Sequence, residues 1–363
     1  MSPRETFFAS LAGKTESAYA FVPITMMYAA DLIGERYVDY QTSASVQVAG
    51  QLAIAERFGA SVVSVISDPA VEAADLGAYV KFPDSSPAHL VEEQSLLADT
   101  AGLAALTARG PLQPEQGTRM ANRLESVRML HEKAGKTHAV EGWVEGPCAE
   151  AADLRGINRL MMDFFGEEVF LNELFDFITE QEILFAQAQL EAGADVIGIG
   201  DAASSLVGPE LYAEWIAPRT QRYVDAIHAA GGLVRLHICG RTEQLAPTIA
   251  GYGVDMIDID FGNDIAVMRE AFAAAADDGI GPAIAGNIDP VTELKDGTPE
   301  QITRRLTECR AAAGPRFMVG AGCEVPRGTP EENVQAMRRF AERGGAVKKK
   351  EDTHKMAEAN KAF

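Results

Sequence analysis

Eight short apolar runs limit the folds open to this chain more than anything else in its sequence. They cover residues 21–25, 61–68, 140–147, 195–201, 233–239, 256–260, 283–287 and 317–323. Runs this short, rich in β-branched residues and bounded by Gly and Pro, are typical of buried parallel strands. The weakest of the eight predictions is 21–25, because Pro23 has no N–H group to give to a neighbouring strand.

The segments between these runs have helical patterns. Residues 209–230 begin with Pro and acidic residues and end at two glycines, and Pro218 predicts a kink or a break within them. Residues 299–313 follow Thr298, a helix-capping residue, and stop at Gly-Pro. Eight strands alternating with helices predict a (β/α)₈ TIM barrel, with a doubly wound open sheet as the alternative. The strand count favours the barrel.

One connection is much longer than the others. Residues 69–139, after the second strand, contain two helical patterns at 88–105 and 117–133. We interpret this stretch as an elaborated connection whose helical elements form a lid over the barrel mouth and set substrate specificity. The alternative is an extra layer of packed helices. The domain prediction is one barrel domain over residues 1–343, followed by a mobile Lys-rich tail at 344–363.

Composition excludes several classes of protein. The 363 residues carry 32 basic and 53 acidic side chains, a net charge of -21, which argues against nucleic acid or an anionic membrane as a partner. No apolar run approaches the ~18 residues of a membrane span, and residues 1–14 lack a signal-peptide core. Four cysteines are too few for a disulfide scaffold, so we expect a cytoplasmic protein with free thiols.

Polar side chains close several of the apolar runs. In a TIM barrel the active site forms at the carboxyl ends of the strands, so these side chains are candidates for chemistry. The candidates for binding substrate or exchanging protons are Asp68, Glu145, Asp201 and Asn287. The alternative role of such a residue is to cap the helix that follows the strand.

A histidine and two cysteines form a sharper pattern. His237 and Cys239 are two residues apart on one strand, so they face the same way, and Cys323 ends the last strand. One imidazole and two thiolates match a catalytic Zn²⁺ site with an open fourth position, although core residues can give the same pattern by chance. Asp260 is a candidate fourth ligand in the absence of substrate, or an acceptor that orients His237.

The segments that carry these residues resemble a known superfamily. The stretches that carry the resemblance are Leu236–Gly240 (LHICG), Gly253–Asp255 (GVD), Gly286–Pro290 (GNIDP), Ala321–Pro326 (AGCEVP) and Thr329–Asn333 (TPEEN). They are similar to the uroporphyrinogen decarboxylase superfamily, and within it to the zinc-dependent corrinoid methyltransferases, which include methylcobalamin:coenzyme M and O-demethylase methyltransferases. The resemblance covers about residues 5–343. It implies a (β/α)₈ barrel in which His237, Cys239 and Cys323 bind zinc.

The chain departs from the decarboxylases of this superfamily at one place. Decarboxylases carry an arginine-rich motif after the first strand, which holds the many carboxylates of their substrate. Here residues 23–30 read PITMMYAA, and the next arginine is Arg36. Asp68 corresponds to the decarboxylase acid that binds pyrrole N–H groups, so its role here is ambiguous. The methionines suggest an adaptable, apolar pocket wall, or core packing.

The resemblance therefore implies zinc-dependent methyl transfer. A corrinoid on a separate partner protein would exchange the methyl group with a small molecule, which could be a methoxy compound, a thiol or tetrahydrofolate, in either direction. Two alternatives stay open. One is a metal-independent enzyme that acts like uroporphyrinogen decarboxylase, and the other is a non-catalytic accessory protein that binds zinc or a corrinoid.

Overall fold

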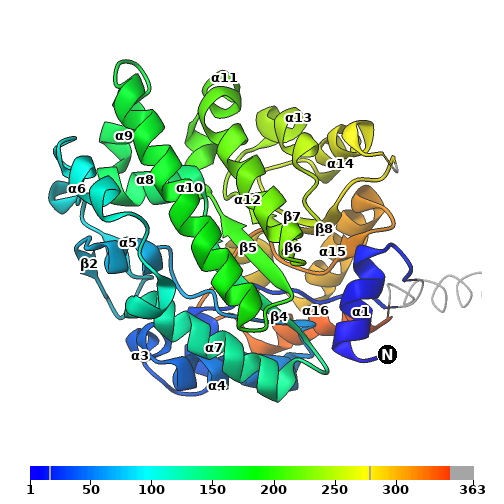
Figure 1. Cartoon of the computed structure of the whole chain (residues 1–363). Helices are drawn as coiled ribbons and strands as arrows, with labels where there is room; N and C mark the ends of the chain where they lie inside the picture. Colours follow the sequence, from blue (N-terminus) through cyan, green and yellow to red (C-terminus); the bar gives the residue numbers. More distant parts are fainter. Residues whose placement is uncertain (16–17, 278, 344–363) are drawn as a thin grey trace, which may run out of the picture.

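A curled, parallel sheet of seven strands forms the centre of the molecule, surrounded by helices (Figure 1). The computed structural model describes residues 1–15, 18–277 and 279–343, so the tail predicted at 344–363 lies outside the described residues. The strands follow the order β1-β4-β5-β6-β7-β8-β9. Their bounds are β1 Val62–Ser64, β4 Ala139–Glu145, β5 Val196–Gly200, β6 Leu233–His237, β7 Met256–Ile259, β8 Ala283–Gly286 and β9 Phe317–Met318.

Helices follow the strands and cover the outside of the sheet. The α-helices are α1 Pro3–Leu11, α2 Met27–Leu32, α3 Tyr37–Thr42, α4 Ala44–Phe58, α5 Val71–Leu76, α6 Gly102–Arg109, α7 Arg119–Ala134, α8 Pro147–Arg155, α9 Ile157–Asp163, α10 Glu168–Glu191, α11 Pro209–Leu211, α12 Ala217–Ala229, α13 Ala246–Ile249, α14 Ile265–Ala275, α15 Pro299–Ala313 and α16 Glu331–Arg343. Short 3₁₀ turns are η1 Glu92–Gln94, η2 Pro114–Gln116, η3 Ala202–Leu206, η5 Glu243–Leu245 and η6 Ala250–Tyr252, and π turns are η4 Tyr212–Ile216 and η7 Pro290–Lys295. Of the described helices, none has both the length and the apolar character needed to cross a membrane.

Seven of the eight apolar runs contain a strand of this sheet, and the first does not. Phe21 makes a single parallel bridge to Val319, and the Ser61 N–H donates to the Phe21 carbonyl oxygen at 2.7 Å. The segment thus lies between the two edge strands, but the prediction of a full strand at 21–25 was wrong. Pro23 cannot donate to a neighbour, and the pairing ends just before it.

The connection from 69 to 139 differs in part from its prediction. The helical pattern at 117–133 is confirmed as α7, whereas 88–105 is helical only from Gly102 onward. The earlier part contains the short antiparallel pair β2 Val80–Lys81 and β3 His89–Leu90, followed by η1. The Ser95 hydroxyl donates to the Glu92 carbonyl, and Asp99 accepts from the Ala101 N–H. Such local side-chain bonds compete with helix formation.

The two helices predicted in most detail behave as their sequences indicate. Thr298 caps α15 in a reciprocal capping box with Gln301. The stretch 209–230 is interrupted by the π turn Tyr212–Ile216, which lies directly before the residues that contain Pro218. Because proline has no N–H, a helix must loosen its hydrogen bonding in the turn that precedes it.

Helix α1 closes the amino end of the sheet. Phe7 is buried in an apolar cluster with residues that begin several strands, among them Val62, Ala139 and Val196. Arg4 forms a two-pronged ion pair with Asp195, at 2.5 and 2.7 Å, just before β5. Helix α1 thus covers part of the amino end with apolar packing, and in parallel α/β barrels the side chains that carry chemistry lie at the carboxyl end.

Trp143 occupies the interior of the sheet near the carboxyl end because its neighbours have no side chains. Trp143 on β4 pairs with Gly198 on β5, and its indole ring also lies against Gly200. A Cβ atom at Gly198 would lie only 2.1 Å from the ring. These two glycines therefore make the space that the indole fills.

Replacing Gly198 should disrupt this packing. In Gly198→Ala the new methyl group must push the indole aside, and overpacking of this kind costs about 3 kcal/mol of unfolding free energy. Urea unfolding followed by tryptophan fluorescence measures the change. The control is Gly251→Ala, where a Cβ atom meets no other atom within 4 Å. Equal stability of the two variants would show that Trp143 is not held against Gly198.

Candidate metal centre

His237, Cys239 and Cys323 meet at the carboxyl end of the sheet. The His237 Nε2 atom lies 3.1 Å from the Cys239 Sγ atom and 3.6 Å from the Cys323 Sγ atom, and the two sulfur atoms are 3.7 Å apart. Within the described residues, this is the group of three or more His, Cys, Asp or Glu side chains close enough together to hold a metal ion. The sulfur separation is far above the ~2.05 Å of a disulfide, so both thiols are free to act as ligands.

Two glycines let the loops that carry the cysteines come together. Gly240, directly after Cys239, has a φ of +88°, a left-handed conformation that favours glycine. A Cβ atom at Gly322 would lie 2.5 Å from the Phe261 nitrogen. Asp260 joins the same loops, because its carboxylate accepts hydrogen bonds from the Gly240 N–H at 2.5 Å and the Phe261 N–H at 2.7 Å.

The carboxylate that contacts His237 is Asp258, not Asp260. The Asp258 Oδ2 atom lies 3.2 Å from His237 Nδ1, which leaves Nε2 to face the cysteines. This corrects the expectation that Asp260 orients the imidazole: β7 ends at Ile259, and Asp260 turns into the loop. Carboxylate-histidine pairs of this kind fix the ligand orientation in metal sites.

Asp258 is itself fixed by a buried arginine. Arg235, two residues before His237 on β6, binds both Asp258 oxygens at 2.7 and 2.8 Å and Glu141 on β4 at 3.2 Å. Burial alone would raise the pKa of Asp258, but the Arg235 charge and the His237 hydrogen bond lower it to about 2. The carboxylate is therefore charged at any physiological pH.

One of the two thiols, Cys323, is placed where a thiolate is favoured, whereas the hydrogen bond to Cys323 and burial raise the pKa of Cys239. A hydrogen bond from Cys239, together with His237, lowers the pKa of Cys323 to about 4 despite its burial. Burial opposes protonation of His237, but the negative charge shared by the cysteines and the contact with Asp258 raise its pKa. A metal ion would displace the protons now shared by the three side chains. One imidazole and two thiolates are the ligands that zinc prefers.

The three side chains face a small cavity of about 160 Å³. Its other lining residues are Ile24, Met26, Ile66, Asp68, Pro69, Trp143, Glu145, Gly200, Asp201, Ala202 and Glu324. The structure thus brings three of the four predicted substrate residues, Asp68, Glu145 and Asp201, to the metal group. Apart from Glu324 the other wall residues are apolar, and the lining includes no lysine or arginine.

Asp68 already has a strong partner. Arg119 of α7 binds both Asp68 oxygens, at 2.8 and 2.6 Å, and both side chains are almost fully buried. Burial would raise the pKa of Asp68, but the Arg119 hydrogen bonds lower it below its usual range. Arg119 and its neighbour Arg123 also donate to the Gln41 carbonyl oxygen. These arginines, which the sequence analysis did not single out, hold α7 against the end of β1.

Glu145 and Asp201 carry protons more readily than ordinary acids. Burial raises the pKa of Asp201 to about 6, although hydrogen bonds from Ser204 and the Ala149 N–H lower it in part. Burial and nearby acids, Glu72 first, raise the pKa of Glu145 well above its usual value. Side chains that can hold a proton near neutral pH suit proton transfer at the cavity.

Asn287, by contrast, does not line the cavity. Its amide nitrogen donates to the Asp260 and Asn263 carbonyl oxygens, at 3.2 and 2.8 Å, on the outer side of the β7 loop. The structure therefore places Asn287 as a support for that loop rather than among the substrate-facing groups. Glu324, beside Cys323, is a cavity residue that the sequence analysis missed, and burial raises its pKa to about 7.

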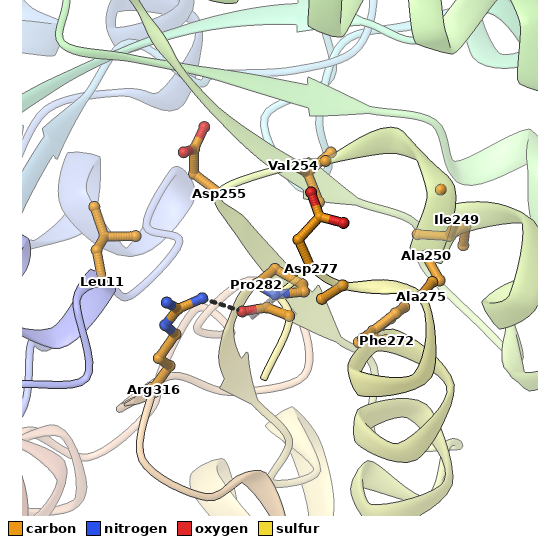
Figure 2. Close-up of a pocket in the computed structure, with 14 residues that line it drawn as sticks. Leu11, Ile249, Ala250, Val254, Asp255, Phe272, Ala275, Asp277, Pro282 and Arg316 are labelled. Atoms are coloured by element: carbon orange, nitrogen blue, oxygen red, sulfur yellow. Dashed lines mark hydrogen bonds between the residues drawn. The ribbon is translucent and has the colours of Figure 1, made fainter. Parts of the chain in front are cut away.

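A larger cavity, of about 570 Å³, lies at the opposite end of the strands (Figure 2). Its lining includes Asp255 and Pro282, which precede β7 and β8, and Arg316, which precedes β9 and donates to the Gly281 carbonyl. Asp255 is bonded to His228 and to the Val234 N–H. The lining contains no histidine or cysteine, so size alone does not make this cavity the site of chemistry.

Comparisons with known proteins agree with this geometry. The family model described as uroporphyrinogen decarboxylase (URO-D) matches residues 2–344, which confirms the superfamily expected from the sequence. The methylcobamide:CoM methyltransferase MtbA of Methanosarcina mazei is 33% identical over 221 residues, which cover 60% of this chain and 62% of that protein. A uroporphyrinogen decarboxylase of Synechococcus sp. (strain CC9605) is 29% identical over 244 residues, covering 64% of this chain and 66% of the relative.

A solved structure shares the fold. The methyltransferase from Methanosarcina mazei superposes with a TM-score of 0.80 at 20% sequence identity, covering 93% of this chain and 98% of that chain. At that identity the likeness concerns the fold alone. The chain spans about three fifths of the length of the curated methyltransferases that it matches in sequence, 61% and 62% for two of them.

Asp258 provides a test of how the metal site is held. In Asp258→Asn the imidazole loses its charged partner, and zinc affinity should fall ~10–100-fold in competition with a chelator. The control is Asp255→Asn, which removes another carboxylate bonded to a histidine, His228, at the other end of the same strand. If both variants hold zinc as tightly as the unmodified protein, Asp258 does not orient a ligand.

Proposed function

We propose that this chain, which belongs to the uroporphyrinogen decarboxylase family, is a zinc-dependent methyltransferase that works with a corrinoid. In this proposal the corrinoid is carried by a partner protein and exchanges its methyl group with a small molecule at the metal cavity. The observation that carries the proposal is the His237, Cys239 and Cys323 group, which faces an apolar cavity without a cationic residue.

The donor set fits zinc. Two sulfur atoms and one imidazole nitrogen lie within 4.8 Å of one another, and the other imidazole nitrogen is already bonded to a carboxylate. When bound, zinc would act as a Lewis acid that holds a thiol as its thiolate or polarises a methoxy oxygen. Asp260 is engaged by two backbone N–H groups, so we assign the open position to substrate rather than to this residue.

The residues around the metal group have separable tasks in this proposal. Arg235 and Asp258 hold the imidazole in one orientation, and Trp143 and Met26 provide apolar walls that limit water. Glu145 and Asp201 take up or supply the proton that a thiol loses or a methoxy oxygen gains. In our assignment, Asp68 positions α7 through Arg119, and Asn287 supports the loop after β7.

A thiol is the acceptor that we favour, with a methoxy compound or tetrahydrofolate as further substrates to test. The methylcobamide:CoM methyltransferases among the relatives support this choice, because coenzyme M is a thiol. Tetrapyrrole decarboxylation is disfavoured, because a cavity of about 160 Å³ whose lining contains no arginine or lysine offers no partner for many carboxylates. A non-catalytic accessory protein remains the outcome if zinc binds without turnover.

We place the corrinoid partner at the carboxyl end of the sheet. Three large apolar side chains are exposed in the turns that follow β5, β7 and β8: Leu206 at 66%, Phe261 at 52% and Val291 at 51%. Exposed apolar groups around a site favour docking of another protein. A corrinoid presented there would meet the open side of the metal group.

Three further features belong to the proposal. The segment at Phe21, hydrogen-bonded to Val319 on one side and Ser61 on the other, acts as the eighth strand of a closed (β/α)₈ barrel in one domain over residues 1–343. The connection 69–139, with α5 packed on α8 and α6 on α10, covers the side of the mouth as a lid. Four unpaired cysteines suit the cytoplasm.

Zinc content and methyl transfer test this function together. The purified protein should hold about one zinc ion per chain and transfer a methyl group from methylcobalamin to coenzyme M. Cys239→Ala and Cys323→Ala should each lose most of the zinc and lower kcat/KM at least ~100-fold, because each removes a ligand. Cys309→Ala, whose thiol lies in a different cavity beside Asn287, should retain both properties.

The outcomes separate the candidate functions. Zinc without transfer to a thiol, a folate or from a methoxy compound supports the accessory protein. A metal-free protein, after growth and purification with added zinc, contradicts the methyltransferase proposal and favours a decarboxylase-like activity. Equal zinc loss in the Cys309 control would point to general unfolding, which circular dichroism detects.

A further inference from the structure

Four glutamates are buried together beside the metal cavity. They are Glu72 on α5, Glu145 at the end of β4, Glu150 on α8 and Glu182 on α10, and their side chains are 2%, 5%, 0% and 0% exposed. We call them the buried glutamate cluster. No ion pair among the described residues includes any member of this cluster.

The cluster has unsatisfied polar groups. Both carboxyl oxygens of Glu150 lack a hydrogen-bond partner, and so does the phenol of Tyr223 on α12, a residue only 1% exposed. Glu182 has only the neighbouring Glu72 carboxyl group, with which it can form a hydrogen bond if one of the two holds a proton. Burial and the negative charges of Glu182, Asp201 and Glu150 raise the pKa of this phenol. Buried groups of this kind need protons, water or an ion as partners.

Protons fit this site better than a cation. Apart from the His237 group, no three His, Cys, Asp or Glu side chains in the described chain bring their ligand atoms within 4.8 Å of one another. No three carboxyl groups of the cluster are therefore close enough together to hold one metal ion. An isolated buried carboxylate is costly, and it becomes neutral by binding a proton. Burial accordingly raises the pKa of Glu72 to about 7, and it raises the pKa of Glu150 and Glu182 well above their usual values.

The cluster is connected to the metal cavity through Glu145. The Glu145 side chain lines the cavity, and its backbone N–H donates to the Glu72 carboxylate at 3.2 Å. Glu182 lies next to Glu72 and influences its pKa, and Glu150 influences the pKa of both Glu145 and Glu182. Carboxyl groups from four elements thus lead away from the metal site into the interior.

Other charged groups face the cluster. Asp153 on α8 and Asp201 after β5 are further acids that raise the pKa of Glu145. The cation that influences Glu72 is Arg119 of α7, which lowers the pKa of Glu72 but is engaged by Asp68. The balance of charge is therefore negative, which favours proton uptake by the cluster.

We propose that the buried glutamate cluster is a proton store that exchanges one proton with the metal cavity through Glu145 when a thiol substrate binds. The inference deepens the proposed function and rests on it. In this step the S–H bond of the thiol breaks, the sulfur keeps the electron pair, and an O–H bond forms on a carboxylate of the cluster. The proton returns to solvent after the methylated product leaves. The chain thus avoids releasing a free proton into an apolar cavity during substrate binding.

Infrared spectroscopy of the zinc-free, substrate-free protein tests the store by itself. Near neutral pH the spectrum should contain the C=O stretching band of protonated carboxyl groups. Glu182→Gln should remove the intensity of one such group, and Glu150→Gln should do the same as a second variant. The control is Glu180→Gln, on the same helix but exposed to solvent. If the unmodified protein lacks this band, the proton store is contradicted. The same holds if Glu180→Gln lowers the band intensity as much as Glu182→Gln does.

Calorimetry of thiol binding tests the exchange with the cavity. Coenzyme M is titrated into the zinc-loaded protein in buffers of different ionisation enthalpy, which gives the number of protons released per thiol bound. The unmodified protein should release clearly fewer than one proton, whereas Glu145→Gln should release about one, since the path is cut. A full proton released by the unmodified protein overturns the exchange. If the zinc-loaded protein binds no thiol, the proposed function fails and the exchange fails with it, while the infrared band still decides whether a store exists.

A cation in the cluster would contradict the proposal directly. Metal analysis of the full chain should find no ion beyond zinc, and added K⁺, Ca²⁺ or Mg²⁺ should leave the melting temperature unchanged.

The stability of the protein should also depend on pH in one direction. Groups whose pKa is raised by folding stabilise the folded state at low pH and lose that contribution as pH rises through the raised pKa. The unfolding free energy should therefore fall between about pH 5 and pH 8, and less steeply in Glu182→Gln than in Glu180→Gln.

Discussion

The buried contact between Arg235 and Asp258 determines much of the rest of the structure. Arg235 is 2% exposed, and it binds Asp258 on β7, Glu141 on β4 and the carbonyl oxygen of Val22. One guanidinium thus joins three parts of the interior that are distant in sequence. Removing one partner from such a buried pair leaves a charge without compensation, which typically costs 3–5 kcal/mol, so about that much stability depends on this contact.

The contact between Arg235 and Asp258 also orients His237 toward the two cysteines. Because Arg235 holds Asp258 in its charged form, a fixed carboxylate faces Nδ1 of His237, and Nε2 points to the two cysteines. Residues 235 and 237 lie on the same face of β6, and 256 and 258 lie on the same face of β7, so strand register alone sets this arrangement. Structural stability and ligand orientation therefore depend on the same few side chains.

The sequence predicts the sheet well where a strand is buried on both faces, because apolar composition then marks it without ambiguity. The first run fails for a local reason, the missing N–H of Pro23, which leaves only one bridge at Phe21. The metal group was predictable from the spacing of His237 and Cys239, but not for the expected reason: β6 ends at His237, so Cys239 reaches the imidazole from the loop rather than from the same strand. The choice between Asp258 and Asp260 was not predictable, since it depends on where β7 ends and its loop turns.

Sequence patterns do not reveal which side chains from different helices and strands come into contact. Arg119 reaches Asp68 across the connection 69–139, and Glu72, Glu150 and Glu182 converge from three helices with no shared motif. The one available indication was a glutamate on the buried face of an amphipathic helix, as for Glu182 in α10. Asn287 shows the opposite case, because a polar residue after a strand was expected at the cavity and supports a loop instead.

X-ray absorption spectroscopy at the zinc edge tests the central claim most directly, because it reads the atoms bound to the metal. The account predicts two sulfur ligands and one imidazole nitrogen in the zinc-loaded protein, with a third sulfur after coenzyme M is added. A zinc environment of oxygen and nitrogen only, or one unchanged by the thiol, would contradict a site in which His237, Cys239 and Cys323 present the metal to a thiol substrate.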